Sequence, residues 1–566
     1  MSTAVTDIPL APPRVPTGRR RRVSAWQTAV VALTLLLALP VLVVLGYLFN
    51  PSAEVWAHLA NTVLADYVRN SLLLMAGVAV GVLTLGVSTA WLTSTCEFPG
   101  RRLFEWALLL PMAIPAYIIA YTYTGMLDFA GPVQSQLRAW FGWSYGDYWF
   151  PEVRSLGGAV VMLSLVLYPY VYLLSRAAFL EQSVCVLDVS RTLGAGPWRS
   201  FFTVALPLAR PAIVTGLTLA LMETLADYGT VQYFGVSTFT TGIFRTWFGL
   251  GDSAAAAQLA ALLMLFVFAL ILLERWSRRQ ARYHHTSNRY KALPRYRLQG
   301  WRRAGAVLAC SLPIVFGFLL PGAQLLQWTL ATAGRMVDAE FVELTLNTLM
   351  VAGMASLLVL VLALFMAYGR RLHPARSTAF AVRVAAMGYA VPGAVIAVGV
   401  MLPFAWLDNT LDGWLRAQFG ISTGLLLSGT LAALIFAYAV RFLAVSLNAV
   451  EAGLGRIRSS MDDAARSLGL SPGQVLWRVH APLMRGTLLT ALLLVFVDVL
   501  KELPATLILR PFNFNTLAVR TFELASDERL ADASSAALAI VLAGILPVIL
   551  LSRSISRSRP GHHHAA

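Results

Sequence analysis

Two stretches of the sequence are copies of one another: "DVSRTLGAGPWRSFFTVALPLARP", which begins at Asp188, and "DAARSLGLSPGQVLWRVHAPLMRG", which begins at Asp463. They align without a gap at an offset of 275 residues. The alignment pairs Arg191 with Arg466, Gly194 with Gly469, Pro197 with Pro472, and Pro207 with Pro482. A repeat at this distance predicts a chain built from two similar halves.

Both copies lie in a strongly apolar chain. Of its 566 residues, 58% are hydrophobic and 13% are charged, whereas a soluble domain is about half apolar and about a quarter charged. The apolar residues form blocks of about twenty, the length of a helix that crosses a bilayer. We therefore expect an all-α membrane protein with twelve transmembrane helices. The expected spans lie near residues 26–48, 69–93, 104–126, 157–176, 208–232, 254–273, 304–328, 345–368, 379–404, 423–443, 485–507 and 533–551.

Six spans per copy is an even number, so the two halves are expected to have the same orientation in the membrane, as parallel repeats. The predicted units are a basic tail at 1–25, a first six-span domain at 26–274, a basic linker at 275–303, a second six-span domain at 304–552 and a tail at 553–566.

The basic residues predict the orientation. Between Arg275 and Arg303 there are ten Lys or Arg residues and no acid, and the "RRRR" that ends at Arg22 precedes the first span. Short basic loops mark the cytoplasmic side, so we expect both termini in the cytoplasm. The net charge of +16 is explained by these loops and does not indicate a nucleic-acid partner.

The repeated stretches fall between the fourth and fifth spans of each half, on the predicted cytoplasmic side. An acid begins each copy, as suits a helix N-terminus. The glycine at 194 or 469 suits a helix end, and the proline three residues later suits the first turn of a new helix. The pattern predicts a helix, a glycine turn and a second helix that leads into the fifth span.

This loop resembles the cytoplasmic EAA loop of bacterial ABC importer permeases. Asp463-Ala464-Ala465 and Gly469 match its pattern with Asp in place of Glu, while Asp188-Val189-Ser190 and Gly194 depart further. The resemblance implies a type I importer permease fold in the inner membrane of a bacterium. In such an importer the loops dock on two copies of an ATPase subunit, and a periplasmic binding protein delivers the substrate. The implied coupling residues are Asp188, Arg191, Gly194, Pro207, Asp463, Arg466, Gly469 and Pro482.

The sequence has no phosphate-binding motif of the form G-x-x-x-x-G-K-[ST]. It also has no recognisable catalytic or cofactor motif. We therefore expect a transport subunit that is not itself an enzyme and needs no cofactor, with ATP hydrolysed by a separate subunit.

Acidic residues lie inside the fifth and eleventh predicted spans. At the repeat offset "METLADYGTVQYF" aligns with "VDVLKELPATLIL", so that Glu223 matches Asp498 and Asp227 matches Glu502. The four-residue spacing predicts that both acids of a span share one helix face. An acid at membrane depth is costly unless it is paired or faces water. Lys501 can neutralise Asp498 locally; alternatively, the acids line a shared path for a cation or contact an external partner.

The segments "KELPATLILRPFNFNTLAV", from Lys501, and "LADYGTVQYFG", from Leu225, resemble those of fused ferric-iron permeases of the ABC family. That resemblance implies ferric iron as the substrate, a hard cation that prefers oxygen ligands. Thiamine, phosphonate and polyamine permeases are relatives and remain alternatives. The sequence predicts no firm metal site.

A transporter of another class remains open. Proton-coupled major facilitators also have twelve spans in two parallel halves, and their basic loop between spans two and three resembles "FPGRR" (98–102) and "YGRR" (368–371). The paired loops between spans four and five have no counterpart in that architecture, which favours the ABC permease.

Overall fold

The computed structural model describes residues 25–49, 53–144, 146–181, 197–279 and 295–557, almost all of them helical. The first half contains α1 (Ala25–Gly46), η1 (Tyr47–Phe49), α2 (Ala53–Thr62), α3 (Leu64–Thr95), β1 (Cys96–Glu97), α4 (Arg101–Ala107), η2 (Leu110–Ala113), α5 (Ala116–Leu127), α6 (Pro132–Phe141), α7 (Leu156–Glu181), α9 (Pro197–Ser200), η3 (Phe201–Ala205), α10 (Leu206–Ala226), α11 (Gly229–Tyr233), α12 (Phe239–Phe244), η4 (Arg245–Gly249) and α13 (Ser253–Arg279).

The second half follows a similar order. Its elements are β2 (Tyr296–Arg297), α14 (Gly300–Ile314), η5 (Val315–Leu319), α15 (Leu320–Met336), α16 (Ala339–Leu372), α17 (Arg376–Ala385), η6 (Ala386–Ala390), α18 (Gly393–Phe419), α19 (Leu431–Gly455), α20 (Ser459–Ser467), α21 (Pro472–Val475), η7 (Leu476–His480), α22 (Ala481–Leu483), α23 (Arg485–Leu500), α24 (Pro504–Leu509), α25 (Leu517–Ser526) and α26 (Leu530–Arg557).

Within the described residues, ten helices are long and apolar enough to cross a membrane, and counting two bent pairs as one span each gives twelve. One pair, Arg101–Ala113 with Ala116–Phe141, bends by 88°, and the other, Pro472–Leu483 with Arg485–Leu500, bends by 84°. The predicted all-α membrane fold is therefore confirmed.

Two of the predicted spans, 104–126 and 379–404, are interrupted and not continuous helices. Each is broken before a proline that the repeat places in equivalent positions, Pro115 and Pro392. The preceding residues, Ile114 (φ −95°, ψ 118°) and Val391 (φ −82°, ψ 126°), are extended. A residue before proline is driven out of the helical region by the proline ring, which explains why both helices stop there.

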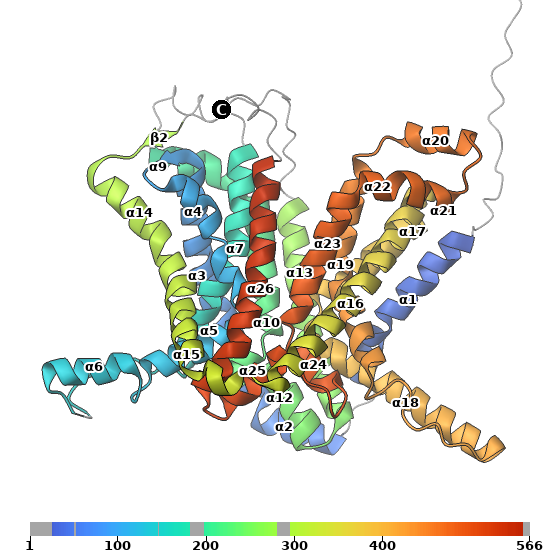
Figure 1. Ribbon diagram of the computed structural model, residues 1–566, viewed down its shortest axis with the longest axis horizontal. Helices are drawn as coiled ribbons and strands as arrows, with labels where there is room; N and C mark the ends of the chain where they lie inside the picture. Colours follow the sequence, from blue (N-terminus) through green and yellow to red (C-terminus); the bar gives the residue numbers. More distant parts are fainter. Residues whose placement is uncertain (1–24, 50–52, 145, 182–196, 280–294, 558–566) are drawn as a thin grey trace, which may run out of the picture.

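The helices form two groups that diverge toward one face (Figure 1). We call this the terminal face, because α1 begins there and α26 ends there. It also carries α9 and α20, whereas α2, α6 and α12 lie toward the opposite face (Figure 1).

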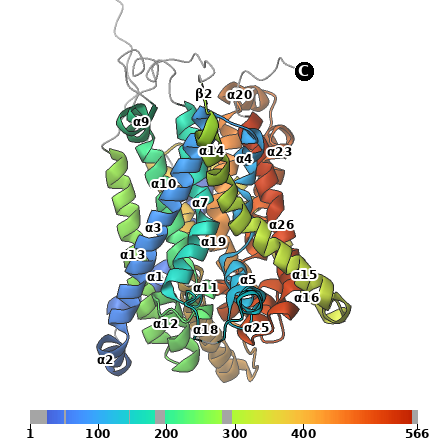
Figure 2. The same cartoon turned by 90° about the vertical axis from the view of Figure 1, so that its left-hand side faces the viewer.

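The first helix of each half packs on the other half. The ring of Trp26 in α1 stacks on Phe365 of α16 at 4.8 Å between centroids, and its Nε1 donates to the carbonyl oxygen of Phe365. Reciprocally, α14 runs obliquely across α3 and α4 of the first half (Figure 2), and in η5, which follows it, the carbonyl oxygen of Phe316 accepts from the Tyr123 hydroxyl at 2.6 Å. This exchange ties the two halves into one body.

Small residues allow the membrane helices to approach closely. A Cβ atom on Gly86 of α3 would lie 2.7 Å from the Cβ of Val171 in α7, and one on Gly216 of α10 would lie 2.8 Å from the Cα of the same valine. Close backbone packing of this kind is how helices associate where lipid provides no hydrophobic driving force.

Candidate functional site

The loop of the second repeat has the predicted local structure. Helix α20 ends at Ser467, and Gly469 follows with a φ of +83°, a left-handed conformation that favours glycine. The amide of Leu470 donates to the carbonyl oxygen of Ala465, which closes the helix end. A reciprocal capping box between Ser471 and Gln474 then starts α21, with Pro472 in its first turn. The predicted helix, glycine turn and helix are confirmed here.

Polar contacts hold this loop against the body of the second half. Asp462 of α20 forms an ion pair with Arg371 at 2.7 Å and contacts the buried ring of His480 at 2.6 Å. Partial burial opposes ionisation of Asp462, but the hydrogen bond from Arg371 and the nearby charges outweigh it and lower the pKa of its carboxyl group. Arg371 also donates to the carbonyl oxygens of Leu454 and Ile457.

The "YGRR" stretch is therefore a support for the loop. The Tyr368 hydroxyl donates to the carbonyl oxygen of Pro472 at 2.8 Å, and Arg370 pairs with Glu451 at 2.8 Å. These contacts join the end of α16 to α19 and α21, which fixes the loop relative to two spans.

The outer side of this loop is exposed on the molecular surface. Leu468 is 83% exposed, and Met461 is also exposed. Of the predicted coupling residues, Asp463, Arg466, Gly469 and Pro482 are exposed beside them, and Pro207 is exposed near the start of α10. The predictions for Asp188, Arg191 and Gly194 fall on residues outside the described part of the chain.

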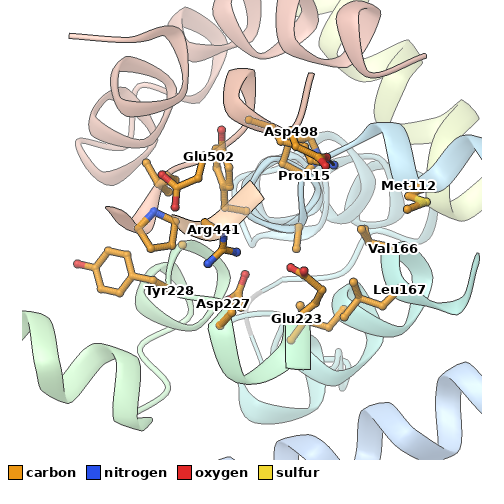
Figure 3. A pocket seen from close by; sticks show the side chains of 18 of the residues that line it. Met112, Pro115, Val166, Leu167, Glu223, Asp227, Tyr228, Arg441, Asp498 and Glu502 are labelled. Carbon is orange, nitrogen blue, oxygen red and sulfur yellow. Dashed lines mark ion pairs between the residues drawn. The ribbon is translucent and has the colours of Figure 1, made fainter. Parts of the chain in front are cut away.

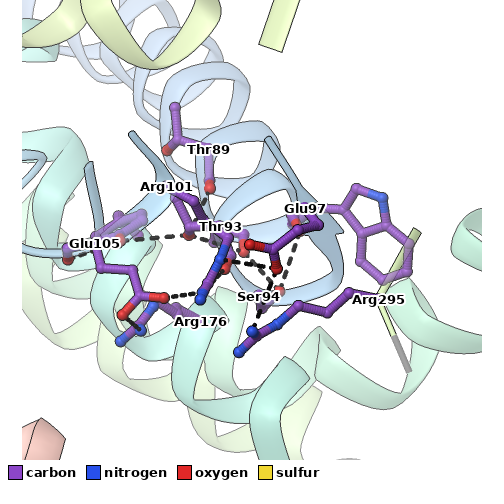
Figure 4. A network of polar contacts seen from close by, with 11 residues as sticks. Thr89, Thr93, Ser94, Glu97, Arg101, Glu105, Arg176 and Arg295 are labelled. Carbon is purple, nitrogen blue, oxygen red and sulfur yellow. Dashed lines mark hydrogen bonds and ion pairs between the residues drawn. The ribbon is translucent and has the colours of Figure 1, made fainter. Parts of the chain in front are cut away.

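On the same face, the "FPGRR" stretch anchors a second polar network (Figure 4). The buried Arg101 pairs with both Glu97 and Glu105, and Glu105 also pairs with Arg176 of α7 at 3.0 Å. Glu97 contacts Arg295 at 3.3 Å, next to the point where β1 pairs with β2 in parallel. The network joins the start of the second half to the first half.

All five residues predicted for a translocation path line one cavity of about 140 Å³ between the two halves (Figure 3). These residues are Glu223, Asp227, Asp498, Lys501 and Glu502. The tyrosines that also line the cavity are Tyr117, Tyr170, Tyr228 and Tyr389. The residues identified from the sequence repeat are therefore close together in the fold. They come from α10, from α23 and from the segments that follow these helices.

The prediction that both acids of a span share one helix face is wrong. Helix α10 ends at Ala226 and α23 ends at Leu500, so Asp227 and Glu502 lie just beyond the helices. Each caps a following short helix. Asp227 accepts from the amides of Thr230 and Val231, both at 3.1 Å, and from the Thr230 hydroxyl.

Glu502 repeats this arrangement in the second half. It accepts from the amides of Ala505 and Thr506, at 2.9 and 3.1 Å, and from the Thr506 hydroxyl at 2.7 Å. Broken spans whose short helix starts point into a central site are typical of transport proteins. The breaks, which sequence periodicity could not show, create the cavity.

The remaining two acids differ in their partners. Asp498 pairs with Lys501 at 3.0 Å, so the predicted local neutralisation is present. The side chain of Glu223 has no hydrogen bond or ion pair to any residue in the described ranges. Nor do the described residues contain a group of three or more metal-binding side chains arranged for a metal ion.

Arg441 of α19 is a lining residue that the sequence reasoning missed. It is 8% exposed and is the single charge within the apolar stretch "LIFAYAVRFLAV" that begins at Leu434. A lone intramembrane charge is a signal for a functional position, so attention to this span would have found it.

A wider hollow of about 710 Å³ lies on the terminal side of the cavity, between α10, α13, η6 and α19. Tyr389 lines both spaces. The structure thus contains a small charged cavity and a larger hollow, with Tyr389 in the wall of both.

A family model described as "Binding-protein-dependent transport system inner membrane component" matches the chain twice, over residues 82–283 and 359–559. The chain belongs to this family. It is a fused permease that carries both membrane halves of an ABC importer, which sets the major-facilitator alternative aside. Membership places this permease in the inner membrane.

Three relatives illustrate the range of substrates among similar permeases. The chain is 25% identical over 94% of its length to the Fe(3+)-transport system permease protein FbpB 2 of Haemophilus influenzae, 99% of which is covered. It is 29% identical over 35% of its length to the molybdenum transport system permease protein ModB of Escherichia coli (87% covered). It is 26% identical over 36% of its length to a probable sulfate transport system permease protein cysT of Chlorokybus atmophyticus (70% covered).

Proposed function

We propose that this permease moves ferric iron into the cytoplasm. The observation that carries the proposal is the cavity in which four carboxylates, Glu223, Asp227, Asp498 and Glu502, meet two basic groups. This excess of acid favours a cation and disfavours oxyanions such as the molybdate or sulfate of the shorter relatives. Carboxylate and phenol oxygens are ligands that a hard cation prefers. The relative that matches nearly the whole chain is named as a ferric permease.

In the proposed mechanism the terminal face is cytoplasmic, so both termini lie in the cytoplasm. A separate ATPase subunit, present in two copies, docks on the loops around Gly194 and Gly469. A periplasmic binding protein releases iron at the opposite face. Closure of the ATPase pair upon ATP moves the loops, and the two helix groups rock to open the cavity alternately to each side. Exposed Leu468 and Arg466 supply an apolar contact and a polar contact for the ATPase.

The experiment that tests the substrate is uptake in cells with and without this chain under iron starvation. Radiolabelled ferric iron, thiamine and molybdate are supplied separately. Loss of iron uptake alone is expected when the chain is deleted. Unchanged iron uptake with loss of thiamine or molybdate uptake would keep the ABC permease but contradict the proposed substrate.

A further inference from the structure

The acids of the cavity are neutralised unequally in the two halves. Asp498 has a base of its own, Lys501, three residues later and 3.0 Å away. At the repeat offset the position that matches Lys501 is Ala226, so Glu223 has no such base on its own helix. The carboxylate oxygens of Asp227 and Glu502 accept hydrogen bonds from the first amides of α11 and α24. Glu223 is therefore the one acid in the cavity whose carboxylate is left available.

Arg441, in contrast to Glu223, is a buried basic residue that has no acidic partner. Its one hydrogen bond runs to the carbonyl oxygen of Val391 at 3.3 Å, and no carboxylate of the described residues lies within ion-pair distance. A guanidinium carries five N–H donors, and a buried charge without a partner is costly. In Figure 3 its head group lies among the carboxylates of Glu223, Asp227 and Glu502.

Two further features show that this place is built to hold a polar group. The hydroxyl of Tyr117, which lines the cavity and is 6% exposed, finds no hydrogen-bond partner in the part of the chain that the structure describes. A Cβ atom on Gly393 would lie 2.7 Å from Oε1 of Glu502 and 2.9 Å from Nη1 of Arg441. The glycine thus gives the arginine head room to enter the cavity.

We infer that Arg441 is the counter-ion of Glu223, supplied by one half to the other, and that the transported cation competes with it for this acid. The two groups are not paired in the structure described, and the pair closes when the two helix groups approach one another over an empty cavity. An entering trivalent cation displaces the guanidinium, and its departure lets the pair re-form, which promotes release. Arg441 thereby sets how much positive charge a substrate needs. The inference rests on the proposed cation function.

The test uses the complete transporter, purified with its ATPase in lipid nanodiscs, and Tb³⁺ as a trivalent, oxygen-seeking probe. Tyrosine-sensitised Tb³⁺ luminescence reports binding, because four tyrosines line the cavity. Arg441→Gln is expected to tighten Tb³⁺ binding by about tenfold or more, since one unit of charge a few Å away is removed at an effective dielectric near 20. Arg441→Lys keeps the charge and should retain the affinity of the unaltered protein.

A double-mutant cycle shows whether Arg441 acts through Glu223. Glu223→Gln should weaken Tb³⁺ binding, and adding Arg441→Gln to it should have a much smaller effect than in the unaltered protein. Arg383→Gln, an exposed arginine of α17, is the matched control and should change nothing. Arg441→Met, which removes the charge and keeps an unbranched side chain, should shift the affinity in the same direction as Arg441→Gln.

The outcomes separate the inference from the proposed function. Suppose that the unaltered protein binds Tb³⁺ and carries iron, and that Arg441→Gln and Arg383→Gln bind Tb³⁺ with equal affinity. This result would overturn the role of Arg441 and leave the proposed function intact. An unaltered transporter that neither binds Tb³⁺ nor carries iron would overturn the cation function, and the inference with it. Should Arg441→Gln fail to assemble with the ATPase, Arg441→Met and Arg441→Lys decide the question, because the first must tighten Tb³⁺ binding and the second must not.

Discussion

At the scale of single residues, the terminal-face loop depends on one backbone conformation. Gly469 has a φ of +83°, and no atom lies near the place that a side chain would occupy. Replacement therefore meets no steric clash, and its cost is the strain of the left-handed conformation, about 1–2 kcal/mol for an ordinary residue. A β-branched side chain adds to this cost.

Gly469→Val is expected to uncouple transport from ATP hydrolysis while the protein still inserts and assembles. The strained turn shifts α20 relative to α21, so the docking surface loses its shape. Substrate uptake in cells and the ATPase rate of the purified complex measure the effect. Gly473→Val, at a half-buried neighbouring glycine without a positive φ and with no atom near an added Cβ, serves as the control. Normal uptake by Gly469→Val at a normal membrane level would count against the coupling role.

At the scale of elements, the two helix breaks that form the cavity depend on capping acids. Asp227 and Glu502 hold equivalent short helices, and the residues after them, Tyr228 (φ −118°, ψ −46°) and Leu503 (φ −117°, ψ −52°), adopt nearly the same backbone conformation. This agreement shows that the repeat extends to local geometry. Asp227 and Glu502 therefore stabilise the helix breaks in addition to lining the cavity.

Asp227→Ala should therefore destabilise α11 by about 1 kcal/mol, the usual cost of losing a helix cap. Asp227→Asn keeps an oxygen acceptor for the amides of Thr230 and Val231 and should retain most of this stability. Thermal unfolding of the purified permease measures the difference. If Asn and Ala lowered the midpoint equally, the negative charge and not the cap would be what stabilises the break.

Sequence reasoning reached the cavity residues through the repeat, which pairs Glu223 with Asp498 and Asp227 with Glu502. It missed the helix breaks, because the four-residue spacing of the acids also fits one helix face, although Gly229 and Pro504 after them are signals of a break. It missed Arg441 because that residue has no counterpart in the repeat. The loop around Gly469 was predictable because glycine, serine and proline each have a specific local preference.

At the scale of the whole molecule, an ion pair joins the two halves near the face opposite the terminal one. Arg154 lies in the segment before α7. Its two terminal nitrogens donate hydrogen bonds to the carboxylate oxygens of Glu528, at 2.7 and 2.8 Å. The guanidinium also lies 5.0 Å from the ring centroid of Tyr233. Glu528 has a φ of +60°, the one positive φ among the described non-glycine residues. Hydrogen bonding to Arg154 lowers the pKa of Glu528, so the pair is charged at neutral pH.

This pair should hold the opposite face closed while the terminal face is open. Arg154→Glu is expected to raise the basal ATPase rate of the complex by a few-fold, since an exposed pair contributes up to about 1 kcal/mol. The swapped variant Arg154→Glu/Glu528→Arg should return the rate toward that of the unaltered protein. A swapped variant no better than Arg154→Glu would show that the contact does not act through charge.

The most direct test of the central claim, that ferric iron crosses through the acid-lined cavity, is radiolabelled ferric-iron uptake by cells that carry Glu223→Gln/Asp498→Asn. The control is Glu343→Gln, an exposed acid of α16 that does not line the cavity. We predict that the double variant reaches the membrane at a normal level and assembles with its ATPase, yet loses iron uptake, while the control retains it. Iron uptake by the double variant equal to that of the control would contradict the account.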